Sequence, residues 1–448
     1  MTRLTLRLAV LFLACGALTV ETPLSAAVRP PKMPYQMVTL PNGLRVILSQ
    51  DHSTPIVHVS VWYHVGSKNE RQGRTGFAHL FEHMMFKGSK NVEPESHTSI
   101  IASVGGRSNA YTTEDETVFW QTVPAHYLPL VLWMEADRMA TLRIDDAAFR
   151  REREVVKEER RMRIENQPYG RLSEIVFDSA FTTHPYKHPT IGSMADLESA
   201  SVQDVRDFHN TYYVPENATV TIVGDFDMDQ AQQLVRQYFA RVPKASRPVP
   251  RDIPKEPVQT RERRVRVEES WPLPAVVVAY KVTYDGHPDA YPLHIAAKIL
   301  SDGQSARLQR ELVYKGMALT AYASANIVED PNLVYAVAIV QPGVAPETVE
   351  KALIAEFEKL RSSPVSDGEL QRSKNQFARD YITGRESIQD KATHLAHAVV
   401  IHNDIATADA EFDLFTNVSK ADVQRVAKTY FNEASRVVVH IASKGGAR

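Results

Sequence analysis

Two histidines and a glutamate within five residues give the strongest chemical signal in the sequence. His79 and His83 lie in an apolar run that predicts one short helix, with Thr75 as its N-cap and Gly88 just past its C-terminus. Because the two histidines are four residues apart, both imidazoles project from one face and can reach a single Zn²⁺ ion. Glu82 lies beside that face, where it can hold a water molecule without being a ligand. This H-x-x-E-H order is the inverted form of the common zinc-protease motif and predicts a zinc site.

A catalytic zinc site needs a third protein ligand, and a second predicted helix offers candidates. Residues 146–163 form an amphipathic pattern with charged residues outside. The apolar residues of this helix are expected to face inward: Phe149, Val155, Val156 and Met162. Glu152 and Glu159 are seven residues apart, two helical turns on one face. Because most glutamates on such a helix are solvated, spacing alone leaves Glu152, Glu158 and Glu159 open as the third ligand.

Length and composition limit the classes of protein that the chain can represent. At 448 residues it is too long for one compact core, and two to four domains are expected. A formal net charge of -2 gives no reason to expect nucleic acid as a partner. The single cysteine, Cys15, lies in the N-terminal segment. Disulfides and thiolate ligands are therefore excluded from the remainder, and a metal must be held by histidines and carboxylates.

The N-terminal segment has the features of a targeting signal. Arg3 and Arg7 flank the start of an apolar run, residues 8–20, that is too short to span a bilayer. Small residues follow, up to Ala27, so we expect residues 1–27 to be a cleaved signal peptide and the protein to be periplasmic or secreted. A lipid anchor on Cys15 is the alternative, although the apolar run before it is very short. No later segment is long and apolar enough to predict a transmembrane helix.

The sequence contains one unit twice. A strand-like segment that begins at Pro55 recurs 219 positions later, at Pro274. Near the end of each half, Asp204 and Asp422 open similar segments that lead into a further predicted strand, and they are 218 positions apart. Two anchors that are far apart in each half and share nearly one displacement predict a duplicated domain.

A proline-rich stretch near the middle of the chain marks the expected domain boundary. Residues 243–257 are predicted to form an extended linker between a catalytic zinc-binding domain, residues 28–242, and a homologous non-catalytic domain, residues 258–448. Each half mixes predicted strands with amphipathic helices, and Asn42-Gly43 is typical of a hairpin turn. The expected fold class is therefore α+β, with two duplicated α/β domains, each a mainly antiparallel sheet layered with helices.

These motifs resemble those of the pitrilysin-type metallopeptidases, which include insulysin and the mitochondrial processing peptidase. The resemblance covers nearly all of the chain after residue 27. It rests on the His79 to His83 motif and on residues 105–112 and 152–159. It implies a fold of duplicated α/β domains, and the length is similar to that of two-domain subunits, such as the catalytic subunit of the mitochondrial processing peptidase and bacterial relatives.

The resemblance also implies roles for individual residues. The third ligand of one zinc ion per chain would be Glu159, while Glu152 would assist from outside the ligand set. Glu82 would accept a proton from a water molecule whose pKa the zinc lowers. An edge strand would bind the peptide substrate as an added β-strand. Its residues would be Asn109, Ala110, Tyr111 and Thr112. Asn109 would contact the substrate backbone near the scissile bond; the alternative is an ordinary sheet strand.

The second half lacks the motif. Positions displaced by 218 or 219 from it fall in residues 297–302, which contain no histidine. Relatives carry an Arg and a Tyr that grip the substrate, but Leu312 and Leu319 occupy those places here, and Arg310 and Tyr322 are out of register. We therefore hypothesise a heterodimer in which a homologous chain without the zinc motif supplies the grip. A homodimer is the rival hypothesis.

The sequence thus predicts a zinc metalloendopeptidase that hydrolyses unfolded peptides or oligopeptides. One alternative is a non-catalytic assembly or peptide-binding protein of the same fold, although such relatives typically lose part of the motif. A periplasmic metal-binding protein with a fortuitous motif is a further alternative, but it leaves Glu159 and the segment from Asn109 to Thr112 unexplained.

Overall fold

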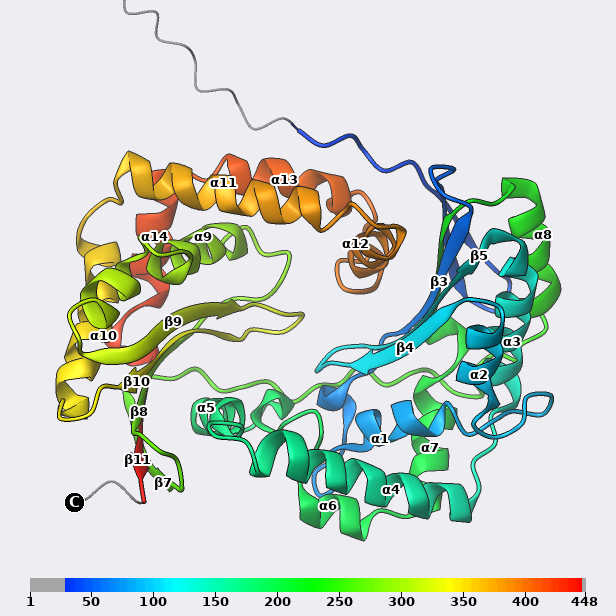
Figure 1. Ribbon diagram of the computed structural model, residues 1–448, viewed down its shortest axis with the longest axis horizontal. Coiled ribbons are helices and arrows are strands. Elements are labelled where there is room, and N and C mark those ends of the chain that lie inside the picture. The colour runs from blue at the N-terminus through cyan, green and yellow to red at the C-terminus, as the bar shows by residue number, and fades with distance from the viewer. Residues whose placement is uncertain (1–28, 445–448) are drawn as a thin grey trace, which may run out of the picture. The chain divides into compact units, whose positions relative to one another are not determined.

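Two β-sheets, each accompanied by helices, form the framework of the chain. The computed structural model describes residues 29–444 (Figure 1). The predicted signal peptide and Cys15 lie outside the described residues. The chain divides into a short unit, Met1–Pro31, and a second unit, Lys32–Arg448, in which all described helices and strands lie.

The first sheet has six strands in the order β1-β2-β6-β3-β5-β4. Neighbours are antiparallel except β2 and β6, which are parallel. The strands are β1 (Gln36–Thr39), β2 (Arg45–Gln50), β3 (Ile56–Tyr63), β4 (Arg107–Thr112), β5 (Thr117–Pro124) and β6 (Ala218–Gly224). The predicted hairpin at Asn42-Gly43 joins β1 to β2, but its loop has five residues rather than two. The Asn42 amide is buried and donates to the Phe239 and Val242 carbonyls, so tertiary contacts set the loop length.

The second sheet repeats the arrangement of the first. Its order is β7-β11-β8-β10-β9, and only β7 and β11 are parallel. The strands are β7 (Arg263–Glu269), β8 (Ala275–Lys281), β9 (Ala318–Asn326), β10 (Leu333–Val340) and β11 (Arg436–Ser443). Since β2, β6, β3, β5 and β4 have the same order and directions, the duplicated α+β fold is confirmed. The positions of the domain boundaries stay a prediction.

Fourteen α-helices lie between the strands of the described chain. Those of the first half are α1 (Phe77–Met84), α2 (Ser96–Ser103), α3 (Leu128–Thr141), α4 (Asp146–Arg160), α5 (Leu172–Ala180), α6 (Met194–Ser199), α7 (Val202–Tyr212) and α8 (Met228–Phe239). Those of the second half are α9 (Ala290–Ser301), α10 (Pro346–Ser362), α11 (Asp367–Thr383), α12 (Ile388–Val400), α13 (Thr407–Thr416) and α14 (Lys420–Tyr430). Among residues 29–444, no helix is long and apolar enough to cross a membrane.

One helix of each half packs on the sheet of the other half. Helix α12 packs on β3 and β6 of the first sheet, where Leu395 and Val399 join a core with Ile47 and Val223 (Figure 1). Helix α5 packs in the same way on β8 and β11 of the second sheet. Because both faces of the central strands are covered, β3 and β8 are buried along nearly their whole length instead of on alternate residues.

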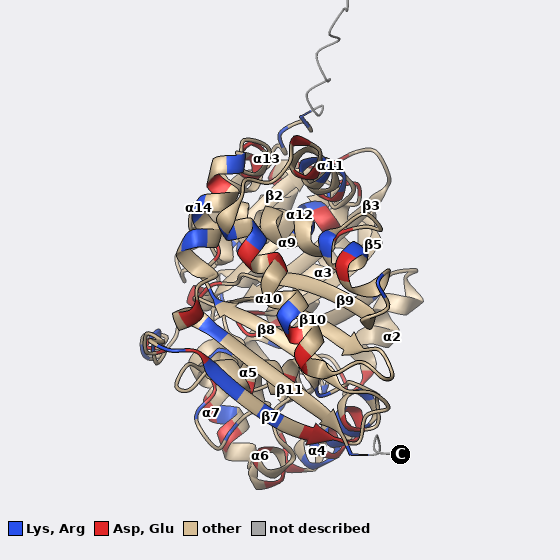
Figure 2. Ribbon diagram, turned by 90° about the vertical axis from the view of Figure 1, so that its left-hand side faces the viewer, with Lys and Arg blue, Asp and Glu red and all other residues tan. Residues whose placement is uncertain are grey.

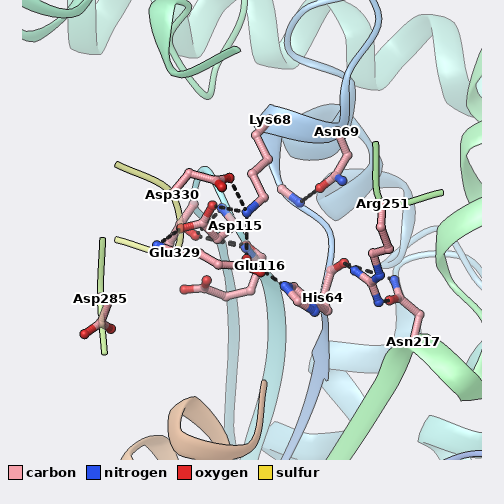
Figure 3. Close-up of polar contacts among 12 residues, drawn as sticks. His64, Lys68, Asn69, Asp115, Glu116, Asn217, Arg251, Asp285, Glu329 and Asp330 are labelled. Carbon is pink, nitrogen blue, oxygen red and sulfur yellow. Dashed lines mark hydrogen bonds and ion pairs between the residues drawn. The ribbon is translucent and has the colours of Figure 1, made fainter. Parts of the chain in front are cut away.

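The two halves also meet through a polar junction near the end of β4 (Figure 3). Lys68 is buried and its Nζ lies 2.9 Å from Asp115 in the turn after β4. The same ammonium lies 2.7 Å from Glu329 and 3.1 Å from Asp330, which belong to the equivalent turn after β9. His64 Nε2 lies 2.7 Å from the same Glu329 oxygen. This junction fixes the turn that follows β4 against the second half.

The edge strand of the second sheet carries charges of both signs. Strand β7 lies at the sheet edge, with arginines at its start and glutamates at its end (Figure 2). Arg264 is paired with Glu350 at 2.8 Å, and Arg263 donates to the Ser179 and Ala180 carbonyls. These charges protect the edge of the sheet from pairing with another chain and form ordinary ion pairs.

Candidate metal centre and active site

The motif helix α1 begins differently from the prediction. Its N-cap is Gly76, with φ +88°, rather than Thr75. The Thr75 hydroxyl donates instead to Asp196, at 2.5 Å. Buried Glu70 accepts from the Gly76 and Ala78 N–H groups at 2.9 and 2.7 Å and so caps the helix from the segment just before it. The helix also ends at Met84, four residues before Gly88. It is nevertheless rigidly anchored, which fixes the histidines that it carries.

The structure brings His79, His83 and Glu159 together. The histidines lie on α1 and Glu159 lies on α4, and one ligand atom from each falls within 4.8 Å of the others. Glu159 Oε2 is 3.3 Å from His83 Nε2 and 3.7 Å from His79 Nε2. The imidazole rings are nearly perpendicular, with centroids 4.9 Å apart. All three predicted ligands therefore converge on one point.

The three glutamates that spacing could not separate have different surroundings. The Glu158 side chain is 58% exposed and pairs with Arg161, so it faces away from the histidines. Glu152 is buried, with Oε2 3.4 Å from His83 Nδ1 and Oε1 2.9 Å from Lys87 Nζ. It therefore contacts the ring nitrogen of His83 that faces away from Glu159.

The inward face of α4 was only half predicted. Phe149 and Val156 are buried as expected, but Val155 and Met162 are exposed. The helical period places Glu152, Val156 and Glu159 on one stripe, so Val155 points outward. Met162 belongs to a π-helical segment, Arg161–Glu165, that follows α4 and changes the register. Such segments are frequent at functional sites.

Glu82 is held inside the site by the strand that faces α1. The Thr112 hydroxyl donates to Glu82 Oε2 at 2.6 Å. Thr112 is the last residue of β4, which lies at the edge of the first sheet and pairs only with β5 in the described chain. The general-base candidate and the candidate substrate strand are thus in direct contact.

The four predicted substrate-binding residues divide between the faces of β4. Alternation places Ala110 and Thr112 on the face toward α1, and Asn109 and Tyr111 on the other. The Tyr111 ring packs edge-on against Trp62, with centroids 6.2 Å apart. The backbone of this strand, rather than the Tyr111 ring, is therefore the part that a peptide can use. The contact of Asn109 with a substrate stays a prediction.

One cavity of about 530 Å³ contains all of these groups. Its lining is His79, Glu82, His83, Phe86, Lys87, Asn109, Ala110, Tyr111, Thr112, Glu152, Glu159 and Arg163. A second cavity of about 300 Å³ shares four of these residues and extends along Ile164, Phe177 and Ile191. The shared residues are His79, Thr112, Glu159 and Arg163. The site is thus an open cleft with an apolar extension.

The electrostatics of the site favour a cation between the histidines and the carboxylates. Burial, together with the neighbouring His83, lowers the pKa of His79 to about 4, so its imidazole is neutral. Burial acts against the charged form of His83 as well, but hydrogen bonds that its N–H groups donate to Glu152 and Glu159 outweigh it and raise its pKa to about 9. Burial raises the pKa of Glu82. The two carboxylates thus draw positive charge onto the site.

Two residues that contact the predicted site glutamates were missed by sequence reasoning. Arg163 Nη1 lies 2.5 Å from Glu159 Oε1, and Lys87 Nζ contacts Glu152. Each is four residues after a site residue, Arg163 after Glu159 and Lys87 after His83. The i, i+4 spacing was therefore the available signal.

The donor set suits Zn²⁺. Two imidazoles and one carboxylate are the ligands of a known type of catalytic zinc site, in which a fourth position stays open to water or substrate. All three residues line the 530 Å³ cavity, which has room for water or substrate beside them. The buried Nδ1 of His79 has no hydrogen-bond partner, so this ring is held by packing.

Comparisons with known proteins identify the family to which the chain is similar. Residues 45–193 match the family model described as insulinase (peptidase family M16), and residues 199–377 match the model described as peptidase M16 inactive domain. The zinc protease PqqE of Helicobacter pylori is 33% identical over 91% of this chain and 92% of its own length. The mitochondrial-processing peptidase subunit beta of Saccharomyces cerevisiae is 22% identical over 86% of each chain.

Solved structures with a similar fold include two from related bacterial proteins. A protease from Helicobacter pylori superimposes with a TM-score of 0.87 at 32% identity and covers 92% of this chain and all of its own. A peptidase M16 inactive domain from Pseudomonas fluorescens has a TM-score of 0.81 at 17% identity, with 91% of this chain and 98% of that one covered. The second similarity bears on the fold alone.

Proposed function

Since this chain belongs to peptidase family M16, whose relatives are named zinc proteases, we propose that it is a zinc-dependent endopeptidase acting on unfolded peptides or oligopeptides. One observation carries the proposal. His79, His83 and Glu159 converge in the cavity that also holds Glu82, and an edge strand lines that cavity. A protein that only binds metal has no need for an acid–base group and a peptide-sized edge beside its ligands.

His79, His83 and Glu159 hold the zinc ion in this proposal. When bound there, zinc supplies a Lewis acid that lowers the pKa of water and polarises a peptide carbonyl. Glu152 positions His83 by accepting from its Nδ1–H, at an N···O separation of 3.4 Å. Lys87 keeps Glu152 ionised and in place, which orients the imidazole as carboxylates do in other zinc sites.

Glu82 is the general base that takes a proton from the attacking water. Burial raises the pKa of Glu82, so this pKa is closer to neutral pH than that of an exposed glutamate. A pKa near the working pH improves proton transfer in both directions. The Thr112 hydroxyl donates to one carboxylate oxygen and leaves the other free. The protonated Glu82 can then deliver its proton to the leaving amine.

The peptide substrate adds to the free edge of β4 as an extra strand. Along Asn109, Ala110, Tyr111 and Thr112, every second residue points its main-chain N–H and C=O groups toward β5, and the residues between them offer theirs to the peptide. Because these are main-chain groups, recognition depends little on substrate sequence. Only an extended peptide can pair in this way, which excludes folded proteins. The apolar extension beside Ile164, Phe177 and Ile191 offers space for a substrate side chain.

We also propose that a second chain completes the enzyme, as a heterodimer with a homologous subunit that lacks the zinc motif. Leu312 is fully buried in the core of the second half and is unavailable to a substrate. Arg310 and Tyr322 are exposed, and Tyr322 lies on the edge strand β9. Because these two side chains could contact a substrate, a homodimer is the rival assembly.

The periplasm or the extracellular space is the proposed location. Mass spectrometry of the mature N-terminus tests cleavage after Ala27 against lipidation of Cys15.

Hydrolysis of a quenched fluorescent peptide by the zinc-loaded chain tests the proposal. The chain is assayed alone and mixed with a homologous subunit without the motif, before and after removal of metal with a chelator. Activity that disappears with the metal and returns with zinc is expected, and activity only in the mixture supports the heterodimer. Strong activity alone contradicts the need for a partner subunit. Zinc binding without hydrolysis in either case contradicts the peptidase and favours a non-catalytic assembly protein.

A further inference from the structure

A second group of metal-ligand side chains lies outside the cavity. Asp285 follows β8 in the loop before α9, His397 lies on α12, and His402 follows that helix. His397 Nε2 and His402 Nε2 lie 3.3 and 3.1 Å from the same Asp285 oxygen, Oδ2. One ligand atom from each residue lies within 4.8 Å of the others, the same criterion that the His79, His83 and Glu159 group meets.

The distances in this group match the edges of a metal coordination sphere. Ligand bonds of about 2.0–2.1 Å in tetrahedral geometry place neighbouring ligand atoms roughly 3.3 Å apart. In the first group, His83 Nε2 and Glu159 Oε2 are separated by 3.3 Å. The distances from Asp285 Oδ2 to the two imidazoles are therefore compatible with a shared ion, and the two imidazole nitrogens lie within 4.8 Å of each other.

The surrounding contacts orient the ligands toward this point. His402 Nδ1 bonds to the Thr407 hydroxyl at 2.9 Å, which directs Nε2 at Asp285. The His397 and His402 rings are nearly perpendicular, at 82°, so they do not stack. Gly286 has φ +86°, and an added Cβ would lie 3.4 Å from the His402 ring. The positive φ favours glycine at this turn, and the loop lies in van der Waals contact with the imidazole.

Acidic side chains surround the group. Glu411 and Asp404 interact with His402, and Asp115 and Glu329 of the junction interact with His397. Asp285 is drawn near that junction in Figure 3. The His402 side chain is 11% exposed and the His397 side chain 42% exposed, so the group is partly open and an ion can enter from solvent.

We propose that Asp285, His397 and His402 form a second site for a divalent transition-metal ion, with zinc as the ion that its ligand set suits. Because α12 packs on the first sheet while Asp285 belongs to the second half, the ion would tie α12 to its own half. The role is structural, and it does not depend on the peptidase proposal. A cluster of histidine–aspartate ion pairs without metal is the competing account.

Counting zinc per chain tests the site. The full chain is stripped with chelator, dialysed against zinc, and measured by inductively coupled plasma mass spectrometry. We expect two ions per wild-type chain and one in either His83→Asn or His402→Asn. The double variant His83→Asn with His402→Asn should bind none. A His83→Asn chain without any ion, or a His402→Asn chain with the wild-type number, would overturn the proposal.

A matched control and a second readout guard against misfolding. His52 also faces an aspartate, Asp225 at 2.6 Å, without a third ligand, so His52→Asn should keep both ions. In the His83→Asn background, zinc should still raise the melting temperature, since an ion that binds only the native state stabilises it. That rise should vanish when Asp285→Asn is added. A rise that persists there contradicts the assignment, whatever the ion count of other variants.

Discussion

Equivalent helix contacts in the two halves are made by different side chains, candidate metal ligands in the first half and a lysine–aspartate ion pair in the second. In the first half, α1 meets α4 through His79, His83 and Glu159. In the second half, α9 contacts α11 in the equivalent way, and a displacement of 219 positions puts Lys298 in the place of His79 and Asp302 in the place of His83. Lys298 Nζ lies 3.0 Å from Asp302 and 2.7 Å from Asp380 on α11. A built-in ammonium thus joins the helices where the first half presents metal ligands.

This difference separates what the fold needs from what the chemistry needs. The first helix pair brings imidazoles and a carboxylate together, and the second brings an ammonium and carboxylates together, so polar contacts join the helices in either half. The ammonium of Lys298 has no open coordination position and cannot act as a Lewis acid. The second half can therefore keep its shape without a metal, whereas the first half keeps its ligands beside an open cavity. Substitutions at matched positions can test this separation.

The largest expected effect comes from a ligand in the first half. Glu159→Gln should weaken zinc binding by more than about 100-fold, because losing a ligand exceeds the 10–100-fold loss typical of a contact outside the ligand set. Asp380→Asn, on the corresponding helix, should leave zinc affinity and peptide hydrolysis unchanged. Competition with a chelating indicator measures both. Equal zinc affinities for the two variants would contradict the claim that only the helix contact of the first half binds zinc.

A smaller loss is expected at the residue that positions His83. Glu152→Gln should lower zinc affinity or kcat by roughly 10–100-fold, since the imidazole loses its orienting carboxylate. Gln371 stands 219 positions after Glu152, and Gln371→Ala should change neither quantity. A Glu152→Gln enzyme with a wild-type zinc affinity and kcat would show that the contact with His83 is incidental.

The segment that connects the halves should respond to acid. Glu256 accepts from the Thr182, Thr183 and His184 N–H groups of the first half and pairs with Lys281 of the second at 2.6 Å. Burial opposes its charge, but these partners outweigh burial and hold the pKa of Glu256 at about 2. A folded-state pKa below the unfolded value means that its stabilisation is present above about pH 4.5 and is lost as the pH falls toward 2.

Urea unfolding at several pH values measures this linkage. Glu256→Gln should cost about 1–2 kcal/mol of unfolding free energy at pH 7, and its stability should fall less than that of the wild type between pH 5 and pH 3, as expected when a charged acceptor is removed. Asp252→Asn, an exposed carboxylate in the same segment, serves as the control. Parallel pH curves for wild type and Glu256→Gln would contradict the assignment.

The smallest effect, a small loss of stability, is expected when Lys298 on α9 is replaced. Lys298→Met removes both ion pairs of α9 but leaves carboxylates that are partly exposed, so a loss of about 1 kcal/mol or less is expected. Thermal unfolding should detect it, while zinc content and hydrolysis stay unchanged. A variant that lost zinc would show that the two helix contacts are coupled.

The sequence predicted local features well because their determinants are local. The spacing of His79 and His83 requires only a helix, and the repeat predicted the duplicated sheets. Contacts between distant segments were less accessible. Thr75 has the residue type of an N-cap, yet Asp196 takes its hydroxyl and Glu70 caps the helix. An amphipathic pattern shows that α12 buries one face but does not say that the face packs on the other half's sheet.

The second metal-ligand group shows the same limit. Asp285 is more than one hundred residues from His397, and no motif spacing connects them. Only α12 and the loop before α9 bring them together. Glu159, in contrast, was identified by resemblance, since helical spacing did not separate it from Glu152 and Glu158.

The most direct test of the account compares two glutamates that differ only in what they face. Glu82→Gln should reduce kcat/KM for peptide hydrolysis by about 10²–10⁴-fold, the range for loss of a general base, while the chain keeps its zinc. Glu158→Gln, on the exposed side of α4, should leave both unchanged. The assay uses whichever assembly, single chain or mixture, hydrolyses peptide. A zinc-loaded Glu82→Gln enzyme with wild-type kcat/KM would contradict the claim that Glu82 is the general base.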